Sequence, residues 1–249
     1  MKIHVTLLAS TCVAWAVLSS SSSADTLAIP GDANIFGAGH STAPDPDGHG
    51  GGALPPSVSF TAGANEVVTF SSVTGSVTLN GSTFNDPDGV GSQASSTDIA
   101  SYQGISGIMA PNAGFLIGVF ETNVEPADPA PAILDFTTIG TNFTTLSPAI
   151  DQTFFIGDGL TGDGTGTQQQ FIVPADATAL YLGIGDNLNP GDPPGYYSDN
   201  GGSFNATFNV VPEPSSFALV GIGLTLCLFR VRVCKGQLRL RWSGSTPHT

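Results

Sequence analysis

Acidic and amide side chains that could bind a metal ion gather near residue 200. Asp186 ends a run of alternating apolar residues, and Asp199 and Asn200 follow a loop rich in Asn, Pro and Gly. Ca²⁺ takes about six to eight oxygen ligands, which carboxylates, amide side chains and backbone carbonyls of a flexible loop can supply. The pattern favours a Ca²⁺ site. An ordinary acidic turn is the alternative, because Asp, Asn and Gly are also common turn residues.

Three further acidic clusters are weaker candidates for a second metal site. Asp45 to Gly48 and Asp86 to Gly89 repeat one tetrapeptide, and Asp158 to Gly164 lies between two expected strands. None has the alternating acids and distal Glu of an EF-hand loop, so we interpret them as turns. Asp86 and Asp88 are the best candidates among them.

The charge distribution excludes some classes of partner. Of the 20 Asp and Glu residues, 19 lie between Asp25 and Val211, whereas all six Lys and Arg residues lie outside that body. Such a body repels phosphates, so we expect no nucleic-acid binding. Divalent cations are its natural counter-charge. The three cysteines also lie outside the body, so no disulfide can stabilise it.

The body lacks most of the residue types that enzymes use for catalysis. The body contains no Cys, Lys or Arg, and its only histidines, His40 and His49, lie in a Gly-rich stretch. We interpret them as solvated rather than metal-binding. Nucleophilic triads and phosphoryl transfer therefore lack their parts, although a glycosidase that uses two carboxylates stays open. We expect no enzyme.

The elements that must position these residues are β-strands. Short alternating runs of Val, Phe, Thr and Ile are separated by Gly, Pro, Asn and Asp, and no run keeps a helical period. This pattern predicts an all-β fold, specifically an antiparallel β-sandwich, with no helix longer than about two turns. The expected strands are Ser57–Phe60, Glu66–Phe70, Gly75–Leu79, Phe115–Phe120, Ile133–Thr137, Thr153–Ile156, Gln169–Val173, Ala179–Gly185 and Ser203–Val211.

The C-terminal half of this body resembles the calcium-dependent galactose-binding bacterial lectin family, whose fold is a jelly-roll-like sandwich. The resemblance rests on the strand that ends at Asp186, on the run Pro194 to Tyr197, and on Asp199 and Asn200 before Gly202, Ser203 and Phe204. It implies that Asp186, Asp199 and Asn200 bind Ca²⁺ through side chains. Tyr196 and Leu79 would add backbone carbonyls, and two sugar hydroxyls would complete the shell.

The chain also departs from that family. An insertion containing Asp192 separates Asp186 from Gly195, and the family's sugar-contacting His and Gln have no counterpart. The resemblance places Asp86 and Asp88 in a loop that borders the sugar site, which makes these two residues, with Asp186 and Asp199, the expected ligand-binding carboxylates. Asp199 replaces an amide of the family, and its added charge favours the metal.

The chain begins like an exported protein. Lys2 precedes the apolar run Val5 to Leu18, and small residues follow up to Ala24. This order predicts a signal peptide over residues 1–24, cleaved before Asp25. We expect a flexible segment at 25–56 and the lectin-like domain at 57–211.

The tail carries a second signal. A Pro212, Glu213, Pro214 motif precedes an apolar segment, and Arg230 and Arg232 follow it. Residues 212–235 thus resemble the PEP-CTERM sorting signal, which implies cleavage by an exosortase in bacteria that make extracellular polysaccharide. The apolar segment predicts a marginal membrane span at 215–233, and the charge bias predicts a cytoplasmic tail at 236–249.

These expectations leave two functions open. The first is an exported envelope or matrix protein whose domain binds a glycan through Ca²⁺. The second is a structural surface protein in which Ca²⁺ only stabilises loops. A permanent membrane anchor is the alternative to exosortase processing, and it would leave the body at the cell surface.

Overall fold

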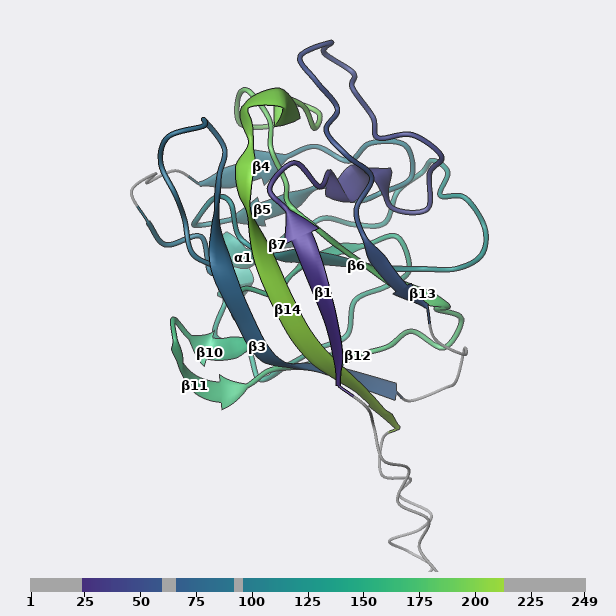
Figure 1. Ribbon diagram of the computed structural model, residues 1–249. Helices are drawn as coiled ribbons and strands as arrows, with labels where there is room; N and C mark the ends of the chain where they lie inside the picture. The colour runs from purple at the N-terminus through teal and green to yellow at the C-terminus, as the bar shows by residue number, and fades with distance from the viewer. Residues whose placement is uncertain (1–23, 60–65, 92–95, 213–249) are drawn as a thin grey trace, which may run out of the picture.

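The computed structural model describes residues 24–59, 66–91 and 96–212 (Figure 1). Strands in several sheets dominate these residues, which confirms the predicted all-β class. The longest described helix is α1 (Phe136–Ile139), and the other two helical segments are single 3-10 turns, η1 (Ile35–Gly37) and η2 (Tyr197–Asp199). Helices therefore only shape loops in this part of the chain.

The largest sheet is built around two long antiparallel strands. β3 (Glu66–Thr78) pairs with β14 (Gly201–Pro212) from one end to the other, with Thr78 opposite Gly201 and Glu66 opposite Pro212. β1 (Asp25–Pro30) covers the other edge of β14. The full order is β1-β14-β3-β12-β8, with β12 at Gln170–Ile172 and β8 at Thr145–Leu146.

Three smaller sheets complete the described fold. The four-stranded sheet has the order β2-β13-β6-β9, with β2 at Ser57–Ser59, β13 at Ala179–Gly183, β6 at Ile117–Glu121 and β9 at Thr153–Phe155. The three-stranded sheet contains β4 (Thr97–Ile99), β5 (Ile108–Ala110) and β7 (Leu134–Asp135), and β10 (Leu160–Gly162) pairs with β11 (Thr165–Gln168).

One hydrophobic core joins the two largest sheets. Phe70 of β3 packs against Phe171 of β12, and Phe171 in turn lies 5.3 Å, between ring centroids, from Phe154 of β9. All three rings are fully buried. Because apolar burial is the main favourable term in folding, this shared core fixes the two sheets on each other without any disulfide.

The two strands expected at Glu66–Phe70 and Gly75–Leu79 are one strand, β3. The sequence predicts a break between Phe70 and Gly75. Gly75 instead has a φ of 107° and lies against the carbonyl of Ser203 in β14, where a side chain would not fit. The glycine permits close approach of two strands and does not end β3.

The expected flexible segment at 25–56 belongs to the fold, and that expectation was wrong. β1 pairs with β14 along its whole length, and Ile29, Ile35 and Phe36 are fully buried. The loop that follows is held by Asn34, whose Nδ2 donates to the carbonyls of Pro44 (3.1 Å) and Gly51 (2.9 Å). A loop without periodicity can therefore still be fixed by hydrogen bonds from one buried amide.

The expected strand Ile133–Thr137 is also only partly correct. β7 occupies two residues of it, and α1 begins at Phe136. The cause is Asp135, which caps α1 by accepting a hydrogen bond from the Thr137 amide at 2.9 Å. Short strands β1, β4, β5, β8, β10 and β11 were not predicted.

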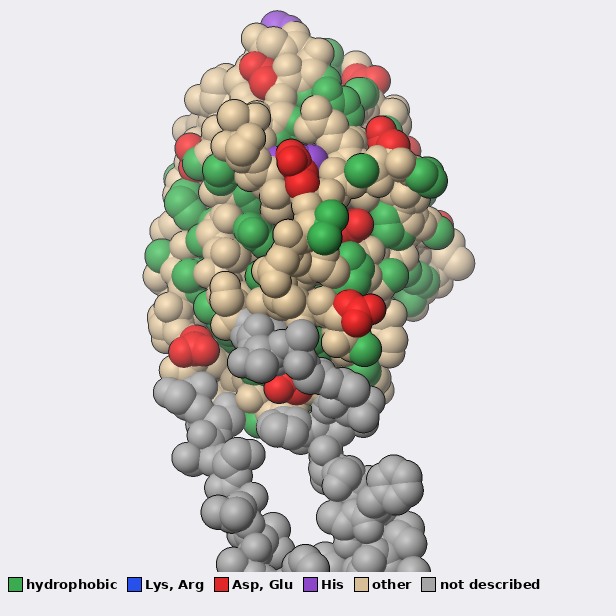
Figure 2. All heavy atoms as spheres, turned by 90° about the vertical axis from the view of Figure 1, so that its right-hand side faces the viewer, with side chains coloured by type: hydrophobic (Ala, Val, Ile, Leu, Met, Phe, Trp, Pro, Cys, Tyr) green, Lys and Arg blue, Asp and Glu red, His purple; other side chains and the backbone are tan. Residues whose placement is uncertain are grey.

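The surface of the described part carries no Lys or Arg side chain, and Figure 2 shows carboxylates scattered among neutral and apolar groups on one face. Among the described residues, no helix is long and apolar enough to cross a membrane. The signal peptide and the span predicted at 215–233 lie outside those residues, as do Glu213, Pro214, Arg230 and Arg232. Pro212 is the last residue of β14.

Candidate metal centre

Asp186 is placed by the strand that precedes it and by a buried tyrosine. β13 runs antiparallel to β6, and the chain leaves the sheet after Gly183. Tyr197 is 1% exposed. Its hydroxyl donates to the Ile184 carbonyl at 3.0 Å and accepts from the Asp186 amide at 3.1 Å. Tyr197 therefore fixes the Asp186 backbone to the loop that carries Asp199.

The pairing of β14 with β3 places the other expected ligands at the same end of the sheets. Asn200 directly precedes Gly201, which is opposite Thr78, the residue before Leu79. The amide of Gly195 donates to the Asp186 carbonyl at 2.9 Å and so brings the loop containing Tyr196 to Asp186. Leu79 thus lines the same pocket as Asp186, and Asp199 and Asn200 lie near the Asp186 carboxylate, whereas Tyr196 lines a different pocket and follows Gly195 in the chain.

The Asp186 carboxylate is buried and incompletely satisfied. The side chain is 8% exposed, and Oδ1 accepts a hydrogen bond from the Asn187 amide at 2.8 Å, whereas Oδ2 is buried without a partner. Burial, with a smaller contribution from the negative charges of Asp199 and Asp47, raises the pKa of Asp186 to about 8. The protein supplies no counter-charge here, because the described chain has no Lys or Arg.

Asn200 shows the same deficiency. Its Oδ1 and Nδ2 are both buried and have no hydrogen-bond partner. Asn200 nevertheless lies close enough to Asp186 for its amide to lower the pKa of that carboxyl. Buried polar atoms in folded proteins are nearly always satisfied, so two neighbouring unsatisfied side chains fit a site for an ion. Their oxygens are the hard ligands that Ca²⁺ prefers.

Asp47 is a further acidic residue at this site that the sequence analysis missed. Its carboxylate lies so close to Gly195 that no side chain would fit at residue 195. The negative charge of Asp47 also contributes to the raised pKa of Asp186. Asp47 belongs to the repeated tetrapeptide at residues 45–48. The repeat was visible, but the surrounding stretch had been interpreted as flexible.

No three carboxylate, histidine or cysteine side chains among residues 24–59, 66–91 and 96–212 form a group that could hold a metal. A metal at Asp186 therefore depends on amide and carbonyl oxygens as well. Those are the ligands expected of Asn200, Tyr196 and Leu79. Tyr196 has a left-handed backbone, with φ at 68°, and it directly precedes η2.

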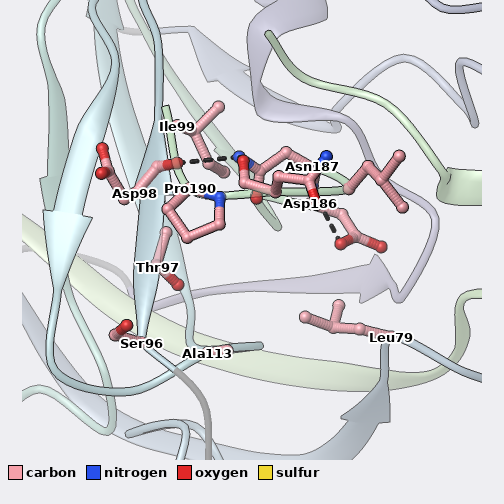
Figure 3. A pocket seen from close by; sticks show the side chains of 12 residues that line it. Leu79, Ser96, Thr97, Asp98, Ile99, Ala113, Asp186, Asn187 and Pro190 are labelled. Carbon is pink, nitrogen blue, oxygen red and sulfur yellow. Dashed lines mark hydrogen bonds between the residues drawn. The ribbon is translucent and has the colours of Figure 1, made fainter. Parts of the chain in front are cut away.

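A pocket of about 510 Å³ lies beside Asp186, with Asp98, Thr97 and Ser96 on the facing side and Leu79 below the carboxylate (Figure 3). Its edge is the insertion after Asp186. Asn187 Nδ2 donates to the Asp98 carbonyl at 2.8 Å, and the Gly191 amide donates to the same carbonyl. The insertion is thus packed against β4 and forms part of the pocket wall.

Asp86 and Asp88 do not line this pocket. Asp86 Oδ1 accepts from the amides of Asp88 and Val90, and Asp88 Oδ1 accepts from the Asp158 amide at 3.1 Å. The two acids therefore face the 158–163 loop, and each has a backbone donor. Burial, with smaller contributions from the charges of Asp158, Asp86 and Asp163, raises the pKa of Asp88 to about 7.

His40, whose side chain is 8% exposed, is not solvated as expected, whereas His49 is exposed in agreement with that interpretation. His40 is bonded to Glu125 Oε1 at 3.1 Å and to the Gln103 carbonyl at 3.0 Å. His49 stacks on Tyr196 with ring centroids 4.5 Å apart. They line different pockets, so they do not form one metal site.

Comparisons with protein-family models, with curated proteins and with solved structures find no match for this chain.

Proposed function

We propose that this chain is an exported, non-catalytic protein whose body is a β-sandwich that binds Ca²⁺ and, through it, a glycan. Asp186 and Asn200 bind the ion through side-chain oxygens, Asp199 adds a carboxylate, and Tyr196 and Leu79 add backbone carbonyls. Asp47 supplies further negative charge. The supporting observation is that Asp186 Oδ2 and both polar side-chain atoms of Asn200 are buried without a hydrogen-bond partner.

The pocket beside the ion supports glycan binding. Asp98, Asn187 and Thr97 present polar atoms around a concave space that opens next to Asp186. Sugars are recognised by small numbers of placed polar groups in such pockets. Ca²⁺ supplies a centre that sugar hydroxyls can coordinate when it is bound.

Processing at both ends completes the proposal. We propose that the signal peptide is removed before Asp25 and that an exosortase recognises the Pro212, Glu213, Pro214 motif. Both positions agree with the ends of the described fold, because β1 starts at Asp25 and β14 ends at Pro212. The product is an envelope or extracellular-matrix protein.

The deciding experiment is a glycan array run on the purified protein in Ca²⁺ and in EDTA. Glycan binding that EDTA removes and that Asp186→Asn with Asp199→Asn also removes supports the proposal. Thermal stabilisation by Ca²⁺ without binding to any glycan would instead favour the structural alternative, in which the ion only holds the loops. Glycan binding that is unaffected by EDTA contradicts the proposed site.

A further inference from the structure

Glu121 is a buried acid in a part of the fold remote from Asp186 along β6 and β13. It is the last residue of β6 and pairs with Ala179, at the opposite end of β13 from Gly183. The side chain is 0% exposed, and Oε1 and Oε2 are both buried without a hydrogen-bond partner. Burying an ionised carboxylate without partners is among the costliest arrangements in a protein.

A second acid faces it. The Asp151 amide donates to the Phe120 carbonyl at 3.0 Å, and the Asp151 carbonyl accepts from the Ser106 amide at 2.9 Å, which fixes Asp151 beside the end of β6. Asp151 has a left-handed backbone, with φ at 62°. Burial, together with the adjacent Asp151 side chain, raises the pKa of Glu121 to about 10.

The described chain offers Glu121 no cation of its own. Lys and Arg are absent from it, and the nearby His40 is bonded to Glu125 and to the Gln103 carbonyl. Glu121 Oε2 instead faces Gly39, at which an added Cβ would lie 3.5 Å from that oxygen. The charge of this acid pair must be neutralised by something other than a side chain of the described residues.

A proton and a metal ion differ in what they satisfy. A single proton turns one carboxyl oxygen into one donor, so Glu121 could bond to Asp151 through that oxygen only. The other oxygen would stay buried without a partner. A cation bound by both oxygens satisfies both and neutralises Asp151 at the same time, and bidentate carboxylates are usual ligands of Ca²⁺.

We propose that Glu121 and Asp151 bind a second divalent cation, with backbone carbonyls and water as the remaining ligands. This site is separate from Asp186 and does not depend on the proposed glycan binding. Ca²⁺ fits better than Mg²⁺, because it accepts irregular shells and gives up its water readily, whereas Mg²⁺ demands a near-ideal octahedron. The role that follows is to join β6 to the loop that contains Asp151.

The Asp86, Asp88 and Asp158 cluster does not support the same inference. Asp86 and Asp88 accept backbone amides, and Asp158 accepts the amides of Leu160 and Gly164 at 2.8 Å. None of these three acids has a buried carboxylate oxygen without a partner. They are satisfied as loop-forming residues.

The test counts bound Ca²⁺ per chain by equilibrium dialysis, after stripping with EDTA, on the full chain. Glu121→Gln keeps the shape of the side chain and removes the charge, so we expect it to bind one ion fewer than the parent. Asp151→Asn should give the same loss, and it is the safer variant because Asp151 is only partly buried. Asp176→Asn, at an exposed turn, controls for the loss of one negative charge.

The outcomes separate the two sites. Loss of one ion in Glu121→Gln together with no loss in the Asp186→Asn, Asp199→Asn double variant supports the second site and sinks the proposed glycan site. The reverse result overturns the second site only. A Glu121→Gln protein that binds as many ions as the parent and is equally or more stable in EDTA identifies a shared proton between the two acids and also overturns the proposal.

Discussion

The Asp186 carboxylate is the central ligand of the proposed Ca²⁺ site. If Asp186, Asp199 and Asn200 bind one ion, Ca²⁺ binds only the folded chain and raises its melting temperature. At a free Ca²⁺ concentration of a hundred times Kd, the free energy of unfolding should rise by about 2.7 kcal/mol. Asp186→Asn with Asp199→Asn should remove that increment. Thermal unfolding in Ca²⁺ and in EDTA measures it.

Two controls make this result specific. Mg²⁺ screens the acidic body as Ca²⁺ does but fits an irregular site poorly, so the part of the increment that Mg²⁺ shares is non-specific. Asp176→Asn removes an exposed carboxylate and should leave the Ca²⁺ increment intact. A double variant that responds to Ca²⁺ as the parent does shows that the acidic loop is only a turn.

Asp88 predicts a pH dependence that does not involve the proposed ions. Its pKa is raised from the ordinary value to about 7 by burial, so between pH 4 and pH 7 the folded chain holds a proton that the unfolded chain has lost. The folded state is therefore favoured at acidic pH, and this contribution disappears as pH rises through about 7. Each unit of pKa displacement corresponds to about 1.4 kcal/mol.

The measurement is urea unfolding in EDTA at several pH values. Asp88→Asn keeps an oxygen that can accept from the Asp158 amide but cannot titrate, so its stability should fall less than that of the parent between pH 4 and pH 7. Asp176→Asn should retain the slope of the parent. Parallel slopes for the parent and Asp88→Asn would show that Asp88 does not titrate as its burial requires.

Tyr197 tests how the backbone near the metal centre is held. Tyr197→Phe removes the only hydrogen-bond acceptor recorded for the Asp186 amide, and a buried unpaired donor costs about 1–3 kcal/mol. We expect that loss of stability together with weaker Ca²⁺ binding, seen as a smaller Ca²⁺ increment in thermal unfolding. Tyr181→Phe on β13 is the matched control and should change neither quantity.

At the scale of elements, period-two alternation predicted the strands that build the two largest sheets, except β1 and β8. β6, β9, β12, β13 and β14 all appear within a few residues of their expected positions. Alternation missed β4, β5 and β8, which have only two or three residues, although it predicted β9 and β12, which are equally short. It also failed at Asp25–Pro30, whose role depends on the exposed edge of β14, a partner far along the chain.

The site followed the same logic. Asp186, Asp199 and Asn200 lie next to strand ends, so a correct sheet brings them together. Asp47 lies in a long loop whose position depends on the buried amide of Asn34, and local sequence pattern does not encode that contact. Asp86 and Asp88 have backbone donors of their own, which sequence alone could not reveal.

β1 yields a prediction about the boundary of the domain. A chain that begins at Ser57, the start of the originally expected domain, exposes the edge of β14 and removes fully buried Ile29 and Phe36. Truncating such a residue to Ala alone costs about 2–5 kcal/mol, so loss of the whole segment should prevent folding. Circular dichroism melts should show cooperative unfolding for residues 25–212 and none for 57–212. A cooperative melt of 57–212 would show that β1 is dispensable.

At the scale of the whole molecule, the candidate metal centre and Pro212, the first residue of the proposed sorting motif, lie at opposite ends of one strand. β14 starts beside Asn200 and ends at Pro212, and its 12 residues span roughly 40 Å in extended form (Figure 1). A chain held at a membrane through its C-terminal segment would therefore carry the Ca²⁺ site on its far side. β1 starts at the same end of the sheet as Pro212, since Asp25 pairs with Phe208.

This geometry makes sorting testable without any assay of binding. We expect mass spectrometry of the exported protein to find its N-terminus near Asp25 and its C-terminus close to Pro214, because neither cut would remove a residue of β1 or β14. Glu213→Ala should leave the tail attached, whereas Ser203→Ala, at an exposed position near the start of β14, should be processed as the parent is. A mature species that still carries Arg239 would contradict exosortase cleavage. It would instead establish a permanent anchor that holds the same acidic body at the surface.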